Sequence, residues 1–194
     1  MQEDKLLILD LDETLIYASE TELERPADFH MGRFHVYKRP HLEEFLTACF
    51  SWFDVAVWTS ASPAYAQGIV KAIFSDLNAL KFVWASDRCT RVYNTHLGDH
   101  YWRKNLKKVQ RKGYVKESIL VIDDTPQKWE KSYGNLVRVS PFEGNAEDTE
   151  LARLIPYLDY LRHEPNVRRI EKRKWRRHNQ SLVLVESSLD RSRR

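Results

Sequence analysis

The chain has 194 residues, of which 42% are hydrophobic, so it can bury one sizeable core, and its length favours a single domain. It contains no run of about 18 apolar residues, and its N-terminus lacks the cationic start and long apolar middle of a signal peptide. Two cysteines, Cys49 and Cys89, are too few for a disulfide framework or a zinc site. These features predict a soluble, cytoplasmic protein without a membrane partner.

The net charge of +3 is unevenly distributed along the chain. Residues 1–161 carry 20 Lys and Arg against 24 Asp and Glu, whereas residues 162–194 carry 11 against 4. A basic segment of this kind can bind nucleic acid or another polyanion. Charged termini are more often simply solvated, and we favour that interpretation. The expected division is a folded domain at 1–162 and a basic tail at 163–194 that is partly helical or disordered.

Short apolar runs alternate with helical patterns along most of the sequence. Taken in chain order, the predicted elements are a strand at 5–10, a helix at 39–50, a strand at 53–60, helices at 62–74 and 104–113, strands at 117–123 and 135–139, and a helix at 149–161. In the second helix, Ser62 can cap the N-terminus and Pro63 suits the first helical position. Alternating strands and helices predict an α/β fold with a parallel sheet covered on both faces.

Two segments interrupt this alternation, at 28–38 and 80–102, and both are rich in aromatic and β-branched residues. We expect them to form small β insertions at the loop edge of the sheet. Only 45 positions separate Thr14 from Thr59, and another 45 separate Thr59 from Lys104. Each interval must hold a helix beside its insertion, so the sequence leaves no room for a large cap domain.

Acidic residues follow two of the predicted strands. Asp10 and Asp12 come at the end of the first strand, and Asp123 and Asp124 end a later one. Ligands of an open parallel sheet bind at the carboxyl ends of its strands, so these carboxylates should converge. Converging carboxylates raise one another's pKa unless a cation joins them. Oxygen ligands without His or Cys favour a hard ion, and the pattern therefore predicts a Mg²⁺ site.

Hydroxyl groups and a lysine accompany the acids. Thr59 and Ser60 follow the second strand, and Lys104 opens the helix before the later acidic strand. Such donors can hold phosphate oxygens, and a carboxylate can attack phosphorus to give an aspartyl-phosphate intermediate. A single strand-end Asp more often caps a turn, and a single Thr, Ser or Lys is more often a solvated residue. The clustering of these side chains is what favours phosphate chemistry.

The stretch DLDETL at residues 10–15 matches the DxDxT signature of the haloacid dehalogenase (HAD) superfamily of aspartate-nucleophile phosphatases. Four further stretches follow in order, namely YKRPHLEEFL, VAVWTSASPAYA, YWRKNLKK and VIDDTP. Over roughly residues 4–160 this set resembles the branch that contains the phosphatases of the RNA polymerase II C-terminal domain (CTD), the small CTD phosphatases and the dullard-like, NIF-type proteins. The resemblance implies a HAD-like Rossmannoid sheet and a Mg²⁺-dependent phosphatase.

The resemblance also implies roles for the acids. Asp10 would be the nucleophile and a metal ligand. Asp12 would protonate the leaving oxygen, later activate water, and lend its backbone carbonyl to the metal. Of the adjacent pair, Asp124 would bind the metal and Asp123 would support it.

Roles follow for the other residues in the same way. Thr14 would brace the loop, Thr59 and Ser60 would hold the phosphate, and Lys104 would stabilise the phosphoryl group. Lys107 and Lys108 compete with Lys104 for this last role, one turn further on. Tyr65 is a candidate for the wall of a substrate groove, although packing of the inserted strands explains it equally well. Relatives often carry an arginine where this chain has Ser86, and whether nearby Arg88 replaces it stays open.

Three alternatives to a protein phosphatase remain. A receiver-type phosphoacceptor module also gathers acids, Thr and Lys around Mg²⁺, but there the paired acids follow the first strand and the lysine comes last. An inactive HAD-fold binding protein would not require the complete set of acids. A small-molecule phosphomonoesterase commonly closes a lid over its substrate. An open site without a cap favours phosphoserine or phosphothreonine in a protein or peptide as the substrate.

Overall fold

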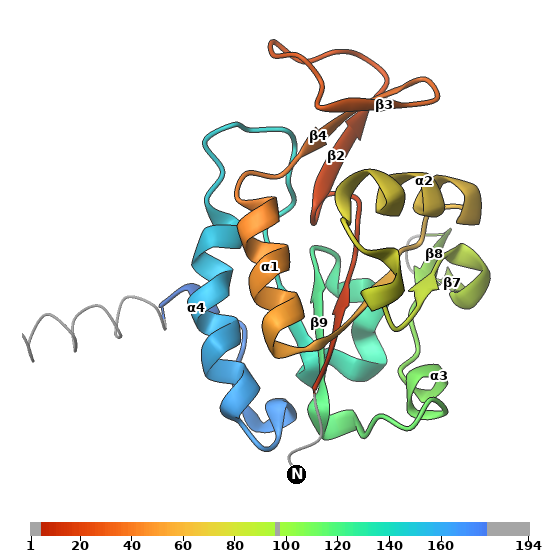
Figure 1. Ribbon diagram of the computed structural model, residues 1–194. Coiled ribbons are helices and arrows are strands. Elements are labelled where there is room, and N and C mark those ends of the chain that lie inside the picture. The colour runs from red at the N-terminus through yellow and green to blue at the C-terminus, as the bar shows by residue number, and fades with distance from the viewer. Residues whose placement is uncertain (1–4, 96–97, 178–194) are drawn as a thin grey trace, which may run out of the picture.

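The computed structural model describes residues 5–95 and 98–177 and has a five-stranded parallel sheet at its centre (Figure 1). In the order β10-β9-β1-β5-β6, the strands are Leu136–Arg138, Ile119–Asp123, Leu6–Leu9, Asp54–Trp58 and Val83–Trp84. The central strand β1 runs in register with both neighbours, so that Leu9 lies beside Val57 of β5 and Ile122 of β9. The residues that follow these three positions therefore meet at one edge of the sheet.

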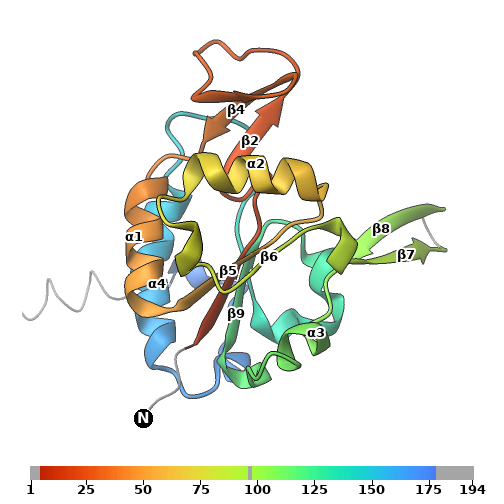
Figure 2. The ribbon, with the colours of Figure 1, turned by 45° about the vertical axis from the view of Figure 1, so that its right-hand side comes forward.

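Helices cover both faces of the sheet, which confirms the predicted α/β class. On one face lie α1 (Leu42–Trp52), α2 (Pro63–Ile73) and α4 (Glu150–His163), and on the other lies the short α3 (Lys107–Gln110), as Figure 2 shows. The 3-10 helices are η1 (Leu77–Ala79), η2 (Ser86–Arg88), η3 (Lys116–Ser118), η4 (Pro126–Asn135) and η5 (Val167–Arg169). The N-terminus of α2 is built as predicted, with Ser62 accepting a hydrogen bond from the N–H of Tyr65 and Pro63 in the first turn.

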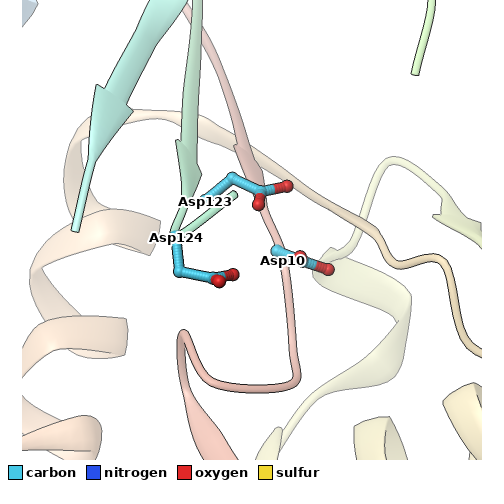
Figure 3. A group of neighbouring side chains, drawn as sticks. All are labelled: Asp10, Asp123 and Asp124. Carbon is cyan, nitrogen blue, oxygen red and sulfur yellow. The ribbon is translucent and has the colours of Figure 1, made fainter. Parts of the chain in front are cut away.

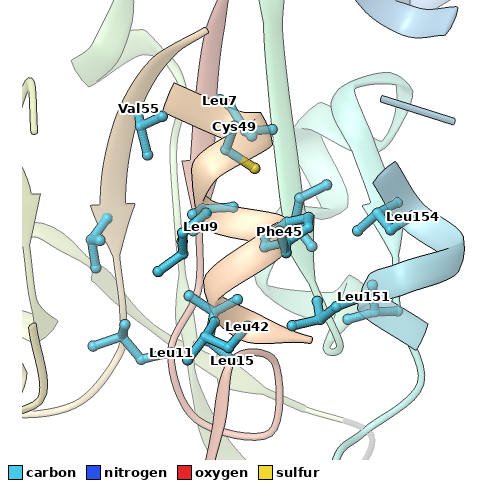
Figure 4. Close-up of a cluster of buried hydrophobic side chains, with 14 of the residues drawn as sticks. Leu7, Leu9, Leu11, Leu15, Leu42, Phe45, Cys49, Val55, Leu151 and Leu154 are labelled. Carbon is cyan, nitrogen blue, oxygen red and sulfur yellow. The ribbon is translucent and has the colours of Figure 1, made fainter. Parts of the chain in front are cut away.

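The larger core lies between the sheet and the pair α1 and α4 (Figure 4). Successive residues of a strand face opposite sides, so Leu7 and Leu9 enter this core while Leu6 and Ile8 enter the core on the other face. From α1, the side chains of Leu42, Phe45 and Cys49 recur at helical spacing and pack onto the strand and onto Leu151 and Leu154 of α4. Each such buried Leu or Phe contributes about 1.5–3 kcal/mol, which fixes β1 and its acidic end in place.

Two small antiparallel sheets flank the central one. The first pairs β4 (Phe34–Lys38) with both β2 (Ile16–Ser19) and β3 (Phe29–Met31), and the second is the hairpin of β7 (Thr90–Asn94) and β8 (Asp99–Arg103). The predicted insertions are thus present, with two differences. Strand β2 adds to the first insertion, and Val83–Trp84 belongs to the central sheet because Val83 pairs with Val57. No large cap domain occurs in the described part of the chain.

The packed chain continues beyond α4. Val167 and Trp175 are buried, and the Trp175 ring stacks on Tyr157 with centroids 5.8 Å apart. The indole N–H of Trp175 donates to the carbonyl of Arg138 at 2.8 Å. Residues 163–177, which the sequence assigned to a basic tail, therefore contribute side chains to the core. The rest of that predicted tail, residues 178–194, lies outside the described residues.

Candidate active site

A tight loop follows the central strand and carries the first acids. The N–H of Asp10 donates to the carbonyl of Ile122 at 3.0 Å, which ties the end of β1 to β9. The chain then turns around the carbonyl of Leu11, which accepts hydrogen bonds of 2.8 to 3.2 Å from the N–H groups of Thr14, Leu15 and Ile16. Glu13 adopts a positive φ of 59° within this turn. The turn sets the directions in which the side chains of Asp10 and Asp12 leave the strand.

The buried guanidinium of Arg39 braces the loop from behind. It donates to the carbonyl of Thr14 at 3.1 Å, to the carbonyl of Ser140 at 3.0 Å, and to both carboxylate oxygens of Asp148 at 2.9 and 2.8 Å. Partial burial alone would raise the pKa of Asp148, but the hydrogen bonds from Arg39 and from the N–H of Glu150 outweigh it and lower that pKa. Arg39 therefore joins the acidic loop to the segment that precedes α4.

Three carboxylates converge at the edge of the sheet. Asp10, Asp123 and Asp124 are buried and each offers one carboxylate oxygen, and these oxygens lie within 4.8 Å of one another (Figure 3). Thr14 donates to Oδ1 of Asp124 at 3.4 Å. Oδ1 of Asp10 is buried and accepts no hydrogen bond from the described residues. A set of converging carboxylate oxygens without His or Cys fits a hard divalent cation.

Two lysines lie among these acids. Lys104 Nζ is 3.1 Å from Oδ1 of Asp10 and 2.6 Å from Oδ2 of Asp123, and its side chain is fully buried. Lys128 Nζ is 2.7 Å from Oδ2 of Asp10. Burial alone would raise the pKa of Asp10, but the two ammonium groups outweigh it and hold that pKa below its ordinary value. Asp10 is therefore an ionised carboxylate inside the protein, which a nucleophile requires.

The adjacent acids Asp123 and Asp124 differ in their partners. Asp123 accepts hydrogen bonds at Oδ2 from Lys104 and from the indole of Trp129, the latter at 2.7 Å, and at Oδ1 from the N–H of Thr125 at 2.9 Å. Asp124 accepts a bond of 2.7 Å from the hydroxyl of Thr125 at Oδ2. Both oxygens of Asp123 thus accept from protein donors, while Oδ1 of Asp124 has only longer contacts, 3.4 Å from the Thr14 hydroxyl and 3.9 Å from Lys128 Nζ.

Asp12 lies apart from the three converging carboxylates. Its Oδ1 accepts a hydrogen bond of 2.7 Å from the hydroxyl of Tyr65, whose ring meets Phe34 edge-on. Burial raises the pKa of Asp12, and the bond from Tyr65 offsets this only in part. A carboxyl group that keeps its proton to higher pH suits an acid catalyst. Tyr65, which the sequence offered either as part of a groove wall or as a packing residue, donates to this carboxyl group.

The remaining candidates are placed less centrally. Thr59 is buried at the end of β5, Ser60 follows it, and among the described residues no hydrogen bond joins either side chain to the acids. Lys108 points elsewhere, because its Nζ donates to the carbonyl of Arg88 at 2.7 Å. The Arg88 guanidinium lies over the ring of Trp84, 5.8 Å from its centroid.

Lys128 belongs to the site but was not predicted from the sequence. Two signals could have identified it. It follows Asp124 by four positions, and Pro126 marks the start of a helical turn between them. One helical turn brings residues at this spacing to the same side, next to the acids.

The parallel sheet with helices on both faces is the haloacid dehalogenase type of fold that the motifs predicted, which is a fold of phosphatases. Its family follows from the sequence: residues 5–168 match the model of the NLI interacting factor-like phosphatases, and the chain belongs to this family. CTD nuclear envelope phosphatase 1 of Xenopus tropicalis is 26% identical over 189 residues, which cover 90% of this chain and 74% of that protein. Nuclear envelope morphology protein 1 of Saccharomyces cerevisiae is 24% identical, with 87% of this chain and 42% of that protein covered.

A solved structure shares the fold. The RNA polymerase II CTD phosphatase Fcp1 of fission yeast, bound to beryllium fluoride, superposes with a TM-score of 0.57 at 17% identity, and covers 96% of this chain. The chain spans 57% of the length of that structure. At this level of identity the likeness supports the fold.

The predicted cytoplasmic location is wrong, since relatives that match most of this chain are named for the nuclear envelope. That prediction rested on hydropathy and cysteine content, and neither property specifies a compartment within the cell. Within the described residues, no helix combines the length and apolar character needed to cross a bilayer.

Proposed function

We propose that this phosphatase is Mg²⁺-dependent and removes phosphoryl groups from serine or threonine side chains of proteins through an aspartyl phosphate on Asp10. The observation that carries the proposal is the setting of Asp10. Its carboxylate is buried, yet it is kept ionised by Lys104 and Lys128 beside two further acids. A surface carboxylate that merely capped a turn would need none of these neighbours.

The chemistry divides between the two acids of the loop. A carboxylate oxygen of Asp10 attacks phosphorus, and the bond from phosphorus to the leaving oxygen breaks. Asp12 gives its proton to that leaving oxygen and becomes a carboxylate. In the second half, Asp12 takes a proton from water as the water attacks the aspartyl phosphate, which releases inorganic phosphate and restores Asp10. Lys104 offsets the negative charge on the phosphoryl group.

The proposed cation fits the donor atoms of the site. Asp10 and Asp124 would hold it through carboxylate oxygens, the backbone carbonyl of Asp12 would complete the protein ligands, and Asp123 would support them. When bound, Mg²⁺ supplies positive charge that reduces repulsion between the carboxylates and an incoming phosphate. The acids account for this role without any His or Cys ligand.

A protein substrate is supported by the shape of the fold and by the relatives. The sheets formed by β2, β4 and β3 and by β7 and β8 carry no helical cap domain within the described residues, so a side chain on a large partner can approach. Relatives are named as phosphatases of the polymerase CTD and of the nuclear envelope. Thr59 and Ser60, at the next strand end, are proposed to contact the phosphate, and Tyr65 to line the approach beside Asp12.

The test is a screen of the purified protein against phosphoserine and phosphothreonine peptides and against phosphorylated metabolites, with Mg²⁺ present. We expect higher kcat/KM for the peptides and loss of turnover in excess EDTA, with recovery on adding Mg²⁺. Asp10→Asn serves as the inactive control, because an amide is too poor a nucleophile. Turnover that persists in EDTA would disprove the metal requirement, and a clear preference for metabolites would disprove the substrate class.

A further inference from the structure

Lys128 lies at the centre of the acidic cluster. Its Nζ is 2.7 Å from Oδ2 of Asp10, 3.5 Å from Oδ1 of Asp123 and 3.9 Å from Oδ1 of Asp124. These are the same three acids whose oxygens converge closely enough to hold a metal ion. The ammonium group therefore pairs with the same carboxylates to which a divalent cation would bind.

Simple charge counting shows why the two cations conflict. Three ionised carboxylates against Lys104 and Lys128 leave the cluster with one negative charge, which is a weak attraction for a doubly charged ion. A divalent cation bound to the acids would also stand within a few ångströms of the Lys128 ammonium, and like charges repel strongly at that distance. Metal binding therefore favours departure of one lysine side chain.

Of the two lysines, Lys128 is the less buried and the better able to leave the acids. The Lys104 side chain is 0% exposed and lies over the Trp129 ring, whereas that of Lys128 is 17% exposed. The backbone of Lys128 is held by two hydrogen bonds. Its carbonyl accepts from the N–H of Lys104 at 2.8 Å, and its N–H donates to the carbonyl of Thr125 at 3.2 Å. The flexible stem can swing toward solvent while the backbone stays in place.

We propose that Lys128 is a tethered counter-ion that competes with the divalent cation for the oxygens of Asp10, Asp123 and Asp124, and so sets the metal affinity of the site. The inference rests on the proposed Mg²⁺ site. In this role Lys128 neutralises the acids whenever metal is scarce and weakens metal binding when metal is present. Lys104, by contrast, keeps its position in both conditions.

The test compares Lys128→Met, Lys128→Arg and wild type by calorimetric titration with Mg²⁺ after removal of metal by a chelator. Lys128→Met removes the competing charge, and we expect its Kd for Mg²⁺ to fall by about tenfold or more. Lys128→Arg keeps the charge and should retain the affinity of wild type. Lys131→Met is the matched control, because Lys131 is an exposed lysine of the same helix η4, and its affinity should not change.

Thermal unfolding supplies a second readout, besides the Mg²⁺ titration, that does not require enzymatic activity. Without metal, Lys128→Met should melt below wild type, since Asp10 and its neighbours lose a counter-ion. With saturating Mg²⁺ the difference should shrink or reverse, because the ion then neutralises the acids. A variant that melts equally far below wild type in both conditions would show that Lys128 serves packing alone and would overturn the inference.

A measurement on wild type guards against a variant that fails to fold. Acylation of lysines by an amine-reactive reagent, mapped by mass spectrometry, should proceed faster at Lys128 when Mg²⁺ is added, while Lys104 stays protected in both conditions. An unchanged rate at Lys128 would overturn the inference, as would equal Mg²⁺ affinity of Lys128→Met and wild type. If wild type and every variant bind no Mg²⁺, the proposed metal site itself fails, and the inference fails with it.

Discussion

Asp10 and Asp12 are separated by a single residue, yet their carboxyl groups meet opposite surroundings. Asp10 lies against two ammonium groups that lower its pKa, whereas Asp12 lies against the Tyr65 hydroxyl and burial raises its pKa. The first environment favours the ionised form that the proposed nucleophile requires, and the second favours the protonated form that the proposed acid requires. Two identical side chains thus acquire different chemistry from their neighbours.

Replacing each acid by its amide should separate the two roles. Asp10→Asn should abolish turnover and phosphoenzyme formation. Asp12→Asn should lower turnover by about 10² to 10⁴, the usual contribution of a general acid–base group, yet still accept a phosphoryl group from an activated aryl phosphate whose leaving group needs no proton. The measurement is intact-protein mass after rapid mixing and acid quench, which should show one added phosphoryl group on Asp12→Asn.

Hydroxylamine treatment is the control, because it should remove the added mass if the group is an acyl phosphate. Labelling of Asp10→Asn would place the nucleophile elsewhere and would contradict the assignment of Asp10.

At the scale of single residues, the sequence predicted the acids of the site but not the ammonium group of Lys128. Asp10, Asp123 and Asp124 could be brought together on paper because strand ends in a parallel sheet share one edge. Lys128 could not be placed in the same way, since its position depends on how the chain turns after Asp124. The spacing from Asp124 indicates on which side Lys128 lies, but the contact of its ammonium with Asp10 on a different strand depends on how the strands pack.

Among the elements, the loop after β1 depends on a contact from a distant segment. Arg39 holds the carbonyl of Thr14 and is itself held by Asp148, which follows more than a hundred residues later. The pKa of Asp148 is lowered in the folded protein. Its contribution to stability is therefore present above the unfolded pKa of about 4 and is lost as the pH falls through the lower folded value.

Asp148→Asn should lower the free energy of unfolding by about 1 kcal/mol at pH 7, a modest figure because Asp148 is partly solvated. The difference from wild type should stay constant down to about pH 5 and shrink below about pH 4. Urea unfolding at several pH values measures it. Asp87→Asn, where the carboxylate is 58% exposed, is the matched control and should change little. A difference that grows in acid would contradict the role given to Asp148.

The regular elements of the sheet were predictable because each buried strand is a continuous apolar run. Two other elements could not be predicted from the local sequence, because contacts with the rest of the fold determine them. The two-residue strand β6 is too short to carry a pattern, and only its pairing beside β5 makes it part of the sheet. Likewise α3 spans only Lys107–Gln110, although the polar, lysine-rich stretch around it predicted a longer helix. Tertiary contacts decide both cases.

At the scale of the whole molecule, the chain after α4 closes the larger core. Trp175 is 1% exposed and stacks on Tyr157, and the neighbouring Val167 is fully buried. A domain that ended at residue 162 would leave the surfaces beneath both side chains open to water. The sequence did not indicate this contact, because Trp175 stands among arginines and lysines in a stretch that is typical of a solvated terminus.

Trp175→Ala should therefore lower the free energy of unfolding by about 3–5 kcal/mol, as expected for a large buried aromatic side chain. A chain ending at residue 162 should lose at least as much relative to one ending at residue 177. Trp102→Ala is the matched control, because that indole is 38% exposed. Equal stability of the chains ending at 162 and 177 would show that the segment contributes nothing to folding.

Three tryptophans form a chain that ends at the acidic cluster. The rings of Trp84 and Trp129 each meet Trp58 edge-on, with centroids 4.9 and 5.5 Å away, and the Trp129 indole donates to Asp123. Indoles packed this closely interact when they absorb ultraviolet light, and their emission responds to nearby charge. Any change in the charge around Asp123 should therefore alter the fluorescence and near-ultraviolet circular dichroism of the unlabelled protein. The protein thus carries its own optical reporter of the site.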